Sequence, residues 1–207
     1  MNSADRAILV FAKAPVDGEV KTRLIPVLGE AGATSLYRRL LHQLVGRLVQ
    51  EQLAAVELWC APDTGHADFQ QLQKLEGVSL YPQRGGDLGQ RMAYATGQAL
   101  QRYRQVLLIG VDCPALHMDL LRQAMDWLQG VDAVLGPAED GGYVLLGLKH
   151  MADCLFSDLP WGTAEVARIT RQCMQNLEWR WRELPVLWDL DRPEDLARLQ
   201  ELALDKS

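Results

Sequence analysis

The unbroken apolar run at residues 106–110 constrains the fold of this chain more than any other segment. A strand that is apolar at every position is typical of the centre of a sheet that helices cover on both faces. Residues 7–12 form a second apolar run, near the start of the chain. We therefore expect a layered fold in which a central sheet is buried between helices.

Strand and helix patterns alternate along the chain. Strands are predicted at residues 7–12, 55–60, 78–81, 106–110, 133–136, 143–148 and 179–186, and helices at 30–52, 67–75, 88–103, 118–128, 164–176 and 193–202. This alternation predicts an α/β fold of three layers around a mainly parallel sheet. The neighbouring strands at 133–136 and 143–148 predict a small antiparallel insertion. No repeat, linker or low-complexity segment divides the sequence, so we expect a single domain spanning residues 1–207.

Composition limits the partners and the compartment. The formal net charge of −6 argues against broad binding to nucleic acids or anionic membranes. No apolar run approaches the roughly 20 residues of a membrane span, and the N-terminus lacks the pattern of a signal peptide. The four cysteines are far apart and form no Cys-x-x-Cys pair, so we expect neither a disulfide framework nor a zinc site. The sequence therefore predicts a cytoplasmic protein, and it leaves the oligomeric state open.

The loop after the first predicted strand is basic on an acidic background. It carries the residues that we expect to bind the phosphates of a nucleotide: Ala12, Lys13, Pro15, Gly18, Lys21, Thr22 and Arg23. Lysine supplies a compact charge, arginine binds two oxygens at once, and glycine lets backbone N–H groups approach phosphate. The alternative is a basic loop that is only solvated. The sequence contains neither a P-loop nor a Gly-x-Gly-x-x-Gly fingerprint, which disfavours P-loop hydrolysis and dinucleotide redox chemistry.

Two aspartates are candidate ligands for Mg²⁺ or Mn²⁺. Asp112 directly follows the central strand, and ligands of open α/β sheets bind beyond the carboxyl ends of the strands. Asp191 precedes the last predicted helix. Each has a structural alternative: Asp112 as the N-cap of the next helix, and Asp191 as half of a capping box with Glu194. Asp191 can both cap the helix and bind the metal if one carboxylate oxygen serves each role.

The segment 85–92 is a candidate contact for the nucleotide base. Gly86 permits close approach of a flat ring, and Gln90 or Arg91 is suited to reading the edge of the base or reaching phosphate. The alternative is an ordinary loop that leads into a helix N-terminus.

Two later segments are candidate contacts for an acceptor. The turn 139–143 contains Gly142 and offers Glu139 or Asp140 as a base, and its alternative is a plain tight turn. The segment 158–163 is suited to a flap in which Trp161 covers the acceptor. Its alternative is a helix cap at Thr163.

Five motifs run through most of the chain in order: Phe11-Ala12-Lys13-Ala14-Pro15, Lys21-Thr22-Arg23-Leu24, Gly110-Val111-Asp112-Cys113-Pro114, Gly136-Pro137-Ala138-Glu139-Asp140-Gly141-Gly142-Tyr143 and Asp158-Leu159-Pro160-Trp161. Together with Gly18 they resemble a bacterial family, formerly of unknown function, of glycosyltransferase-like proteins associated with radical-SAM and arsenosugar gene clusters. The resemblance implies the nucleotide-diphospho-sugar transferase fold, also called GT-A.

A more distant similarity concerns the phospholactate and molybdenum-cofactor guanylyltransferases. Their Lys-x-Arg-Leu loop corresponds to Lys21-Thr22-Arg23-Leu24. In the wider fold, one aspartate after the central strand and one before the last helix hold the metal, and the resemblance implies these roles for Asp112 and Asp191.

These observations lead to three hypotheses about function. The first is a metal-dependent, glycosyltransferase-like enzyme that takes a nucleoside-diphosphate sugar and a small acceptor, with Lys21, Arg23 and Asp140 as catalytic residues. Many glycosyltransferases of this fold carry Asp-x-Asp where this chain has Asp112-Cys113-Pro114. The alternative is therefore a nucleotidyltransferase that joins a nucleoside triphosphate to a small phosphorylated acceptor. The third hypothesis is a non-catalytic nucleotide-binding protein.

Overall fold

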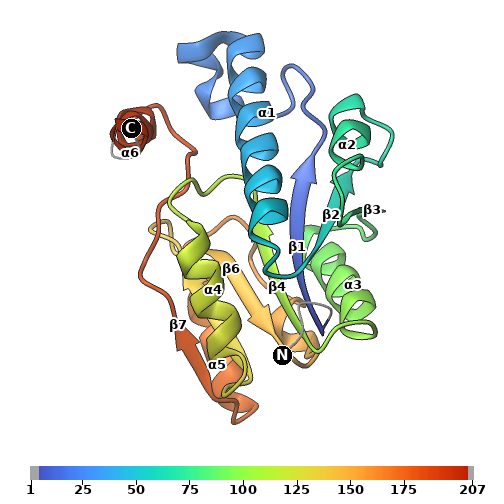
Figure 1. Cartoon of the computed structure of the whole chain (residues 1–207). Coiled ribbons are helices and arrows are strands. Elements are labelled where there is room, and N and C mark those ends of the chain that lie inside the picture. The colour runs from blue at the N-terminus through green and yellow to red at the C-terminus, as the bar shows by residue number, and fades with distance from the viewer. Residues whose placement is uncertain (1–4, 205–207) are drawn as a thin grey trace.

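The computed structural model describes residues 5–204, which form a seven-stranded sheet with helices packed on it (Figure 1). The strands are β1 (Arg6–Lys13), β2 (Ala55–Ala61), β3 (Val78–Pro82), β4 (Gln105–Gly110), β5 (Ala133–Pro137), β6 (Tyr143–Leu148) and β7 (Trp181–Glu183). The helices are α1 (Ile25–Glu51), α2 (Ala67–Leu72), α3 (Leu88–Leu100), α4 (Met118–Trp127), α5 (Val166–Asn176) and α6 (Asp195–Leu204). Two short 3₁₀ turns, η2 (Thr22–Leu24) and η3 (Asp153–Leu155), lie between them.

Parallel pairing dominates the sheet, whose strand order is β3-β2-β1-β4-β6-β5-β7. β1 pairs in parallel with β2 and with β4, β2 pairs with β3, and β5 pairs with β7. β6 runs antiparallel to both of its neighbours, β4 and β5. The predicted α/β fold with a mainly parallel sheet and a small antiparallel insertion is confirmed.

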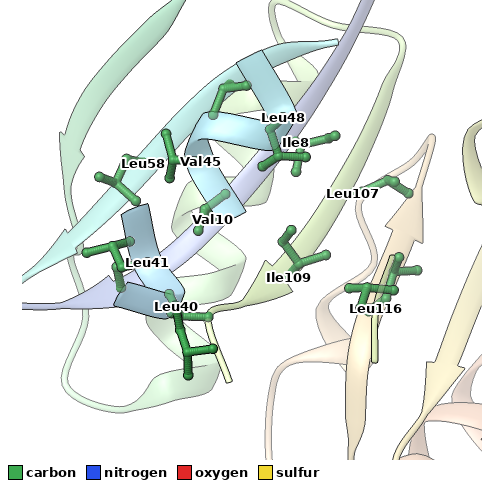
Figure 2. Close-up of a cluster of buried hydrophobic side chains, with 14 of the residues drawn as sticks. Ile8, Val10, Leu40, Leu41, Val45, Leu48, Leu58, Leu107, Ile109 and Leu116 are labelled. Atoms are coloured by element: carbon green, nitrogen blue, oxygen red, sulfur yellow. The ribbon is translucent and has the colours of Figure 1, made fainter. Parts of the chain in front are cut away.

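The apolar run of β1 is buried on both faces of the sheet. Ile8 and Val10 belong to the same cluster as Leu41 and Val45 of α1, which covers this face of the sheet (Figure 2). Leu9 points the other way, into the cluster formed with α3 and α5. The three β1 side chains are at most 1% exposed, and burying each one stabilises the fold by about 1.5–3 kcal/mol. This two-sided burial explains why the run contains no polar residue.

The strand order reverses beside β1. The chain builds β2 and β3 on one side of β1 and then crosses to place β4 on the other side. The loops that follow β1 and β4 therefore leave the sheet in different directions, and a crevice opens beyond the carboxyl ends of these two strands. The candidate functional site lies at this crevice.

Two predicted elements have different bounds in the structure. The helix expected at residues 30–52 begins at Ile25, and Gly29 has a non-helical φ of 70° that kinks α1 near its start. The apolar periodicity in the sequence is visible only beyond this kink. The strand expected at 179–186 is reduced to β7, because the chain after Glu183 keeps an irregular path along β5, with Leu184 N donating to Leu135 O (2.9 Å).

The structure corrects one prediction about the cysteines. Cys154 and Cys173 form a disulfide between η3 and α5, although they are 19 residues apart. Cys60 and Cys113 are free. Disulfides are rare in reducing compartments, so the cytoplasmic location stays a prediction. Within residues 5–204, no helix combines the length and the apolar character that crossing a membrane requires.

The disulfide predicts a thiol count and a stability change. Protein denatured without reductant should expose two reactive thiols, and four after reduction, in a colorimetric thiol assay. Cys173→Ser should lower the free energy of unfolding by about 3 kcal/mol, because a loop of this length is no longer closed in the unfolded chain. Urea titration without reductant measures this loss.

Reduction of the wild-type protein should cause the same loss, and reductant should not affect Cys173→Ser further. Four reactive thiols in protein that has been denatured but not reduced would contradict the pairing.

Candidate functional site

A cavity of about 510 Å³ lies beyond the carboxyl ends of β1 and β4. Its wall combines residues from the loop after β1, from the end of β4 and from the segment before α6. It carries four cationic and four acidic side chains: Lys13, Lys21, Arg23, Arg91, Glu19, Asp87, Asp112 and Asp191. A mixture of cations and carboxylates at one crevice is suited to a phosphate group that arrives with a divalent metal.

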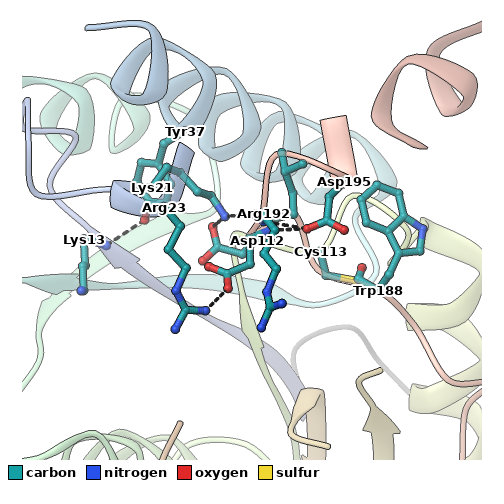
Figure 3. A network of polar contacts seen from close by, with 11 residues as sticks. Lys13, Lys21, Arg23, Tyr37, Asp112, Cys113, Trp188, Arg192 and Asp195 are labelled. Atoms are coloured by element: carbon teal, nitrogen blue, oxygen red, sulfur yellow. Dashed lines mark hydrogen bonds and ion pairs between the residues drawn. The ribbon is translucent and has the colours of Figure 1, made fainter. Parts of the chain in front are cut away.

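Lys21 is the residue that joins the parts of this wall. Its side chain is only 4% exposed, and its Nζ lies 2.6 Å from Oδ1 of Asp112 (Figure 3). The same Nζ donates to the carbonyl oxygen of Leu190. Leu190 N in turn donates to Asp112 O (2.7 Å). Three segments that are far apart in the sequence are thereby fixed around one buried ammonium group.

Arg23 pairs with the second predicted metal ligand. Its guanidinium group donates to Oδ2 of Asp191, and both side chains are well exposed (66% and 38%). An exposed ion pair contributes only about 0–1 kcal/mol. Arg23 can therefore exchange Asp191 for a phosphate oxygen at little cost in stability.

The structural alternatives for the two aspartates do not hold. Asp112 is not an N-cap, because α4 begins at Met118 with His117 at that position. The capping box of Asp191 with Glu194 is wrong as well: the carboxylate of Asp195 accepts from the backbone N–H groups of Asp191 (3.0 Å) and Arg192 (2.7 Å). The carboxylates of Asp112 and Asp191 are therefore free of capping roles and face the cavity.

The donor set fits Mg²⁺ or Mn²⁺. Oδ1 of Asp112 is buried and makes no hydrogen bond of good geometry to a described residue, apart from its ion pair with Lys21. Among residues 5–204, no group of three or more His, Cys, Asp or Glu side chains forms a metal cage. Mg²⁺ in nucleotide sites is held by one or two carboxylates together with phosphate oxygens, so a pair of aspartates is sufficient.

The other predicted nucleotide contacts divide into two groups. Ala12, Lys13, Thr22 and Arg91 line the cavity together with Lys21 and Arg23, whereas Pro15, Gly18, Gly86 and Gln90 do not. Gly86 and Gln90 are engaged with each other, since Gly86 N donates to Oε1 of Gln90 (3.0 Å). Arg91 is held by a bond from its Nε to Gly85 O (3.1 Å). The binding roles of all these residues stay predictions.

Sequence reasoning missed four polar residues of the cavity wall: Glu19, Tyr37, Gln83 and Asp87. Tyr37 of α1 accepts a hydrogen bond from Lys13 N (2.9 Å), and burial is the main reason that the pKa of its hydroxyl is raised. Tyr37 lies on the apolar face of a helix, so the sequence pattern predicts a core residue at this position. The Gln83 amide donates to Trp59 O (2.9 Å) and Ala12 O (3.2 Å). Its position directly after β3 was a signal for a residue at this edge of the sheet.

A second cavity, of about 260 Å³, adjoins the first. The two share Phe11, Leu88 and Gly110 in their walls. Three of the predicted acceptor contacts line the second cavity: Asp140, Gly142 and Trp161. Asp189 lines it too, and the pKa of this half-buried carboxyl is raised by burial and by the nearby charge of Asp140.

Glu139 does not line the second cavity. Its two oxygens accept from the guanidinium group of Arg198 in α6, both at 2.8 Å, and this pairing lowers the pKa of Glu139. The sequence offered both Glu139 and Asp140 as candidate bases. The structure pairs Glu139 with Arg198, which lies 59 residues further along the chain, and leaves Asp140 in the wall of the second cavity.

The flap, defined as residues 158–163, closes one side of the second cavity. Trp161 packs edge to face on Tyr143, with ring centroids 6.1 Å apart. It also rests on α3 at Gly89, where a Cβ would lie 2.6 Å from Nε1 of Trp161 and 2.1 Å from the carbonyl oxygen of Phe156. Glycine is therefore needed at position 89 for the flap to close on α3.

Cys113 does not have the properties of a nucleophile. Burial raises the pKa of its thiol to about 12, and the thiol donates to Trp188 O (3.2 Å). Reactive cysteines have lowered pKa values, so covalent catalysis by this residue is not expected.

Comparison with known proteins identifies relatives of this chain. Residues 44–163, more than half of the chain, match the family DUF2064, described as uncharacterized protein conserved in bacteria. Among curated proteins, the chain is 31% identical over 104 residues to a malonyl-[acyl-carrier protein] O-methyltransferase from Halorhodospira halophila. This match covers 48% of the chain and 35% of that protein, so the chain spans about a third of the length of this curated relative.

Solved structures share the fold. A candidate nucleotide-diphospho-sugar transferase from Desulfovibrio desulfuricans G20 superposes with a TM-score of 0.83 and 31% identity, covering 93% of this chain and 84% of that one. A CMP:2-keto-3-deoxy-manno-octonic acid synthetase complexed with CTP gives 0.60 at 9% identity, covering 98% and 100%. A Mycobacterium tuberculosis H37Rv protein solved with manganese gives 0.50 at 17% identity, covering 95% and 98%. The last two similarities concern the fold alone.

The ion pair of the buried Lys21 ammonium group with Asp112 predicts that Lys21 stabilises the folded chain. Lys21→Met should leave the buried oxygens of Asp112 and Leu190 without a partner and lower the free energy of unfolding by about 1–2 kcal/mol. Lys13→Met is the matched control, because Lys13 is exposed and makes no ion pair with a described residue. Its effect should stay within about 0.5 kcal/mol. Urea denaturation compares the two, and equal losses would contradict the assigned role of Lys21.

Proposed function

Because the chain belongs to the DUF2064 family and has the fold of nucleotide-diphospho-sugar transferases, we propose that it is a transferase that acts on an activated nucleotide. The form we propose is transfer of a glycosyl group from a nucleoside-diphosphate sugar to a small acceptor. The observation that carries the proposal is the convergence of Lys21 and Arg23 with Asp112 and Asp191 around one cavity. The adjoining second cavity provides room for the group that is transferred or accepts it.

The basic side chains would act on the leaving diphosphate. Lys13 and Arg23 are exposed at the cavity and are able to contact phosphate oxygens directly. Lys21 is held in place, so its charge is preorganised where negative charge develops during transfer. Asp112 and Asp191 would hold Mg²⁺ or Mn²⁺, which supplies a Lewis acid that neutralises charge on the phosphates.

Asp140 is the proposed proton acceptor for the incoming hydroxyl. It lines the second cavity, which meets the first at Phe11, Leu88 and Gly110. A base at this place lies on the acceptor side of the bond that breaks, as general base catalysis requires. Trp161 would cover the reacting groups and keep water from them.

Nucleotidyl transfer is the second candidate on the same site. The four cationic side chains of the first cavity are equally suited to holding the β- and γ-phosphates of a nucleoside triphosphate that leave as pyrophosphate. The two reactions differ in the product that is released.

Binding of nucleotide should depend on metal and on the residues of the first cavity. In calorimetry with Mg²⁺ and a panel of nucleoside diphosphates and triphosphates, Asp112→Asn and Arg23→Ala should each weaken the tightest ligand about tenfold or more, because each loses a charge-assisted contact. Asp119→Asn and Arg192→Ala are the matched controls, since neither residue lines either of the two cavities. Metal-dependent affinity that survives Asp112→Asn would remove Asp112 from the site.

The product released separates the two reactions. Glycosyl transfer predicts a nucleoside diphosphate when the protein is incubated with nucleotide sugars and a mixture of small acceptors. Nucleotidyl transfer predicts pyrophosphate from a nucleoside triphosphate. Asp140→Asn should reduce glycosyl turnover by about 10²–10⁴-fold while nucleotide affinity is retained. Binding without turnover in either assay would support a non-catalytic nucleotide-binding protein.

A further inference from the structure

The second cavity differs from the first in the charges that line it. Among the described residues of its wall, the charged side chains are those of Asp140 and Asp189, and there is no Lys, Arg or His. The first cavity has both signs of charge in its wall, including four cations. The boundary between the two environments falls at Phe11, Leu88 and Gly110, which belong to both walls.

Two carboxylates without a cation select against anions. A carboxylate or phosphate group placed in the second cavity meets like charge, and no side chain of the wall offers a compensating charge. Hydroxyl and ammonium hydrogens are attracted instead, because carboxylates accept hydrogen bonds from both. The charge of the ligand is therefore restricted by the wall itself.

Apart from Thr163, whose hydroxyl donates to Pro160 O, the rest of the wall is mainly apolar and aromatic. Phe11, Tyr143 and Trp161 supply rings, and Met92 and Val166 supply aliphatic surface. The volume of about 260 Å³ corresponds to about nine water molecules at ~30 Å³ each. That is room for one ring and its substituents, with an apolar face that packs on the aromatic side chains.

Tyr143 adds a polar group to this apolar wall. Its hydroxyl oxygen is buried and has no hydrogen-bond partner among the described residues. Buried hydroxyl groups normally have a partner. Tyr143 and Trp161 both line the second cavity, and their rings pack edge to face.

We propose that the second cavity binds a non-anionic ring that donates hydrogen bonds, with its apolar face on Trp161 and its hydroxyl or ammonium hydrogens directed to Asp140 and Asp189. A phosphorylated or carboxylated ring is excluded from this place. The inference rests on the proposed function for the assignment of the phosphates to the first cavity, and it deepens that function by giving the chemical class of the second substrate.

Two sets of matched ring compounds test the selectivity. One set is cyclohexanol, cyclohexylamine, cyclohexanecarboxylate and cyclohexyl phosphate, and the other is methyl glucoside, glucosamine, glucuronate and glucose 6-phosphate. Ligand-observed NMR titrations against the full chain, with and without Mg²⁺ and a nucleoside diphosphate, measure each affinity. In at least one set, the neutral or amine member should bind at least tenfold more tightly than both anionic members.

Variants locate the selectivity. Asp140→Asn should reduce the discrimination against anions from at least tenfold to about threefold or less, because half of the repelling charge is removed. Asp119→Asn, a carboxylate on α4 that pairs with Arg122, is the matched control and should leave the discrimination unchanged. Trp161→Ala should abolish binding of the ring, and Trp161→Phe should retain it.

Anionic members that bind as tightly as neutral ones, or eight compounds that all fail to bind, would overturn the proposal. The same calorimetry of nucleotides separates this failure from failure of the proposed function. If nucleotide binds with Mg²⁺ and the rings show no selectivity, only this inference fails. If the rings are selective and no nucleotide binds, the second cavity stands and the proposed function fails.

Discussion

The buried ammonium group of Lys21 is the contact on which the arrangement of the site depends. It lies in a loop after β1, its ion-pair partner follows β4, and its carbonyl partner belongs to the segment before α6. Removing such a group would leave oxygens of two other segments without their charge partner. The position of Asp191 relative to Asp112 therefore depends on a residue that contributes both charge and structure.

The sheet explains why these segments meet. The reversal of strand order beside β1 sends the loops after β1 and β4 apart, and residues at and beyond the ends of these two strands contribute to the walls of both cavities. Residues 7–10 of β1 and 106–109 of β4 are buried on both faces of the sheet, and the polar side chains that reach the first cavity, such as Lys13, lie at the strand ends or beyond them. Rigid strands hold the loops, and the loops carry the chemistry.

Sequence reasoning succeeded where local pattern and sheet geometry coincide. The apolar runs of β1 and β4 predict central strands, and the rule that ligands lie beyond the carboxyl ends of strands directs attention to Lys21 and Asp112. It failed where a contact joins distant residues. The pairing of Cys154 with Cys173 and of Glu139 with Arg198 depends on how helices dock, and neither leaves a periodic signal in the sequence. Tyr37 was missed because it does have a periodic signal: its spacing along α1 is that of a core residue, and this spacing gives no sign of its place in the cavity wall.

The central claim is that the loop after β1 and two distant aspartates surround one metal ion and its phosphates. A crystal of the full chain grown with Mn²⁺ and a nucleoside diphosphate, measured for the anomalous signal of manganese, tests this claim most directly. The account predicts one anomalous peak within coordination distance of Asp112 and Asp191. Phosphate oxygens should complete the coordination shell of the manganese ion, and the Arg23 side chain should be turned toward these oxygens. Manganese bound elsewhere, or a diphosphate whose oxygens lie far from Lys21 and Arg23, would contradict it.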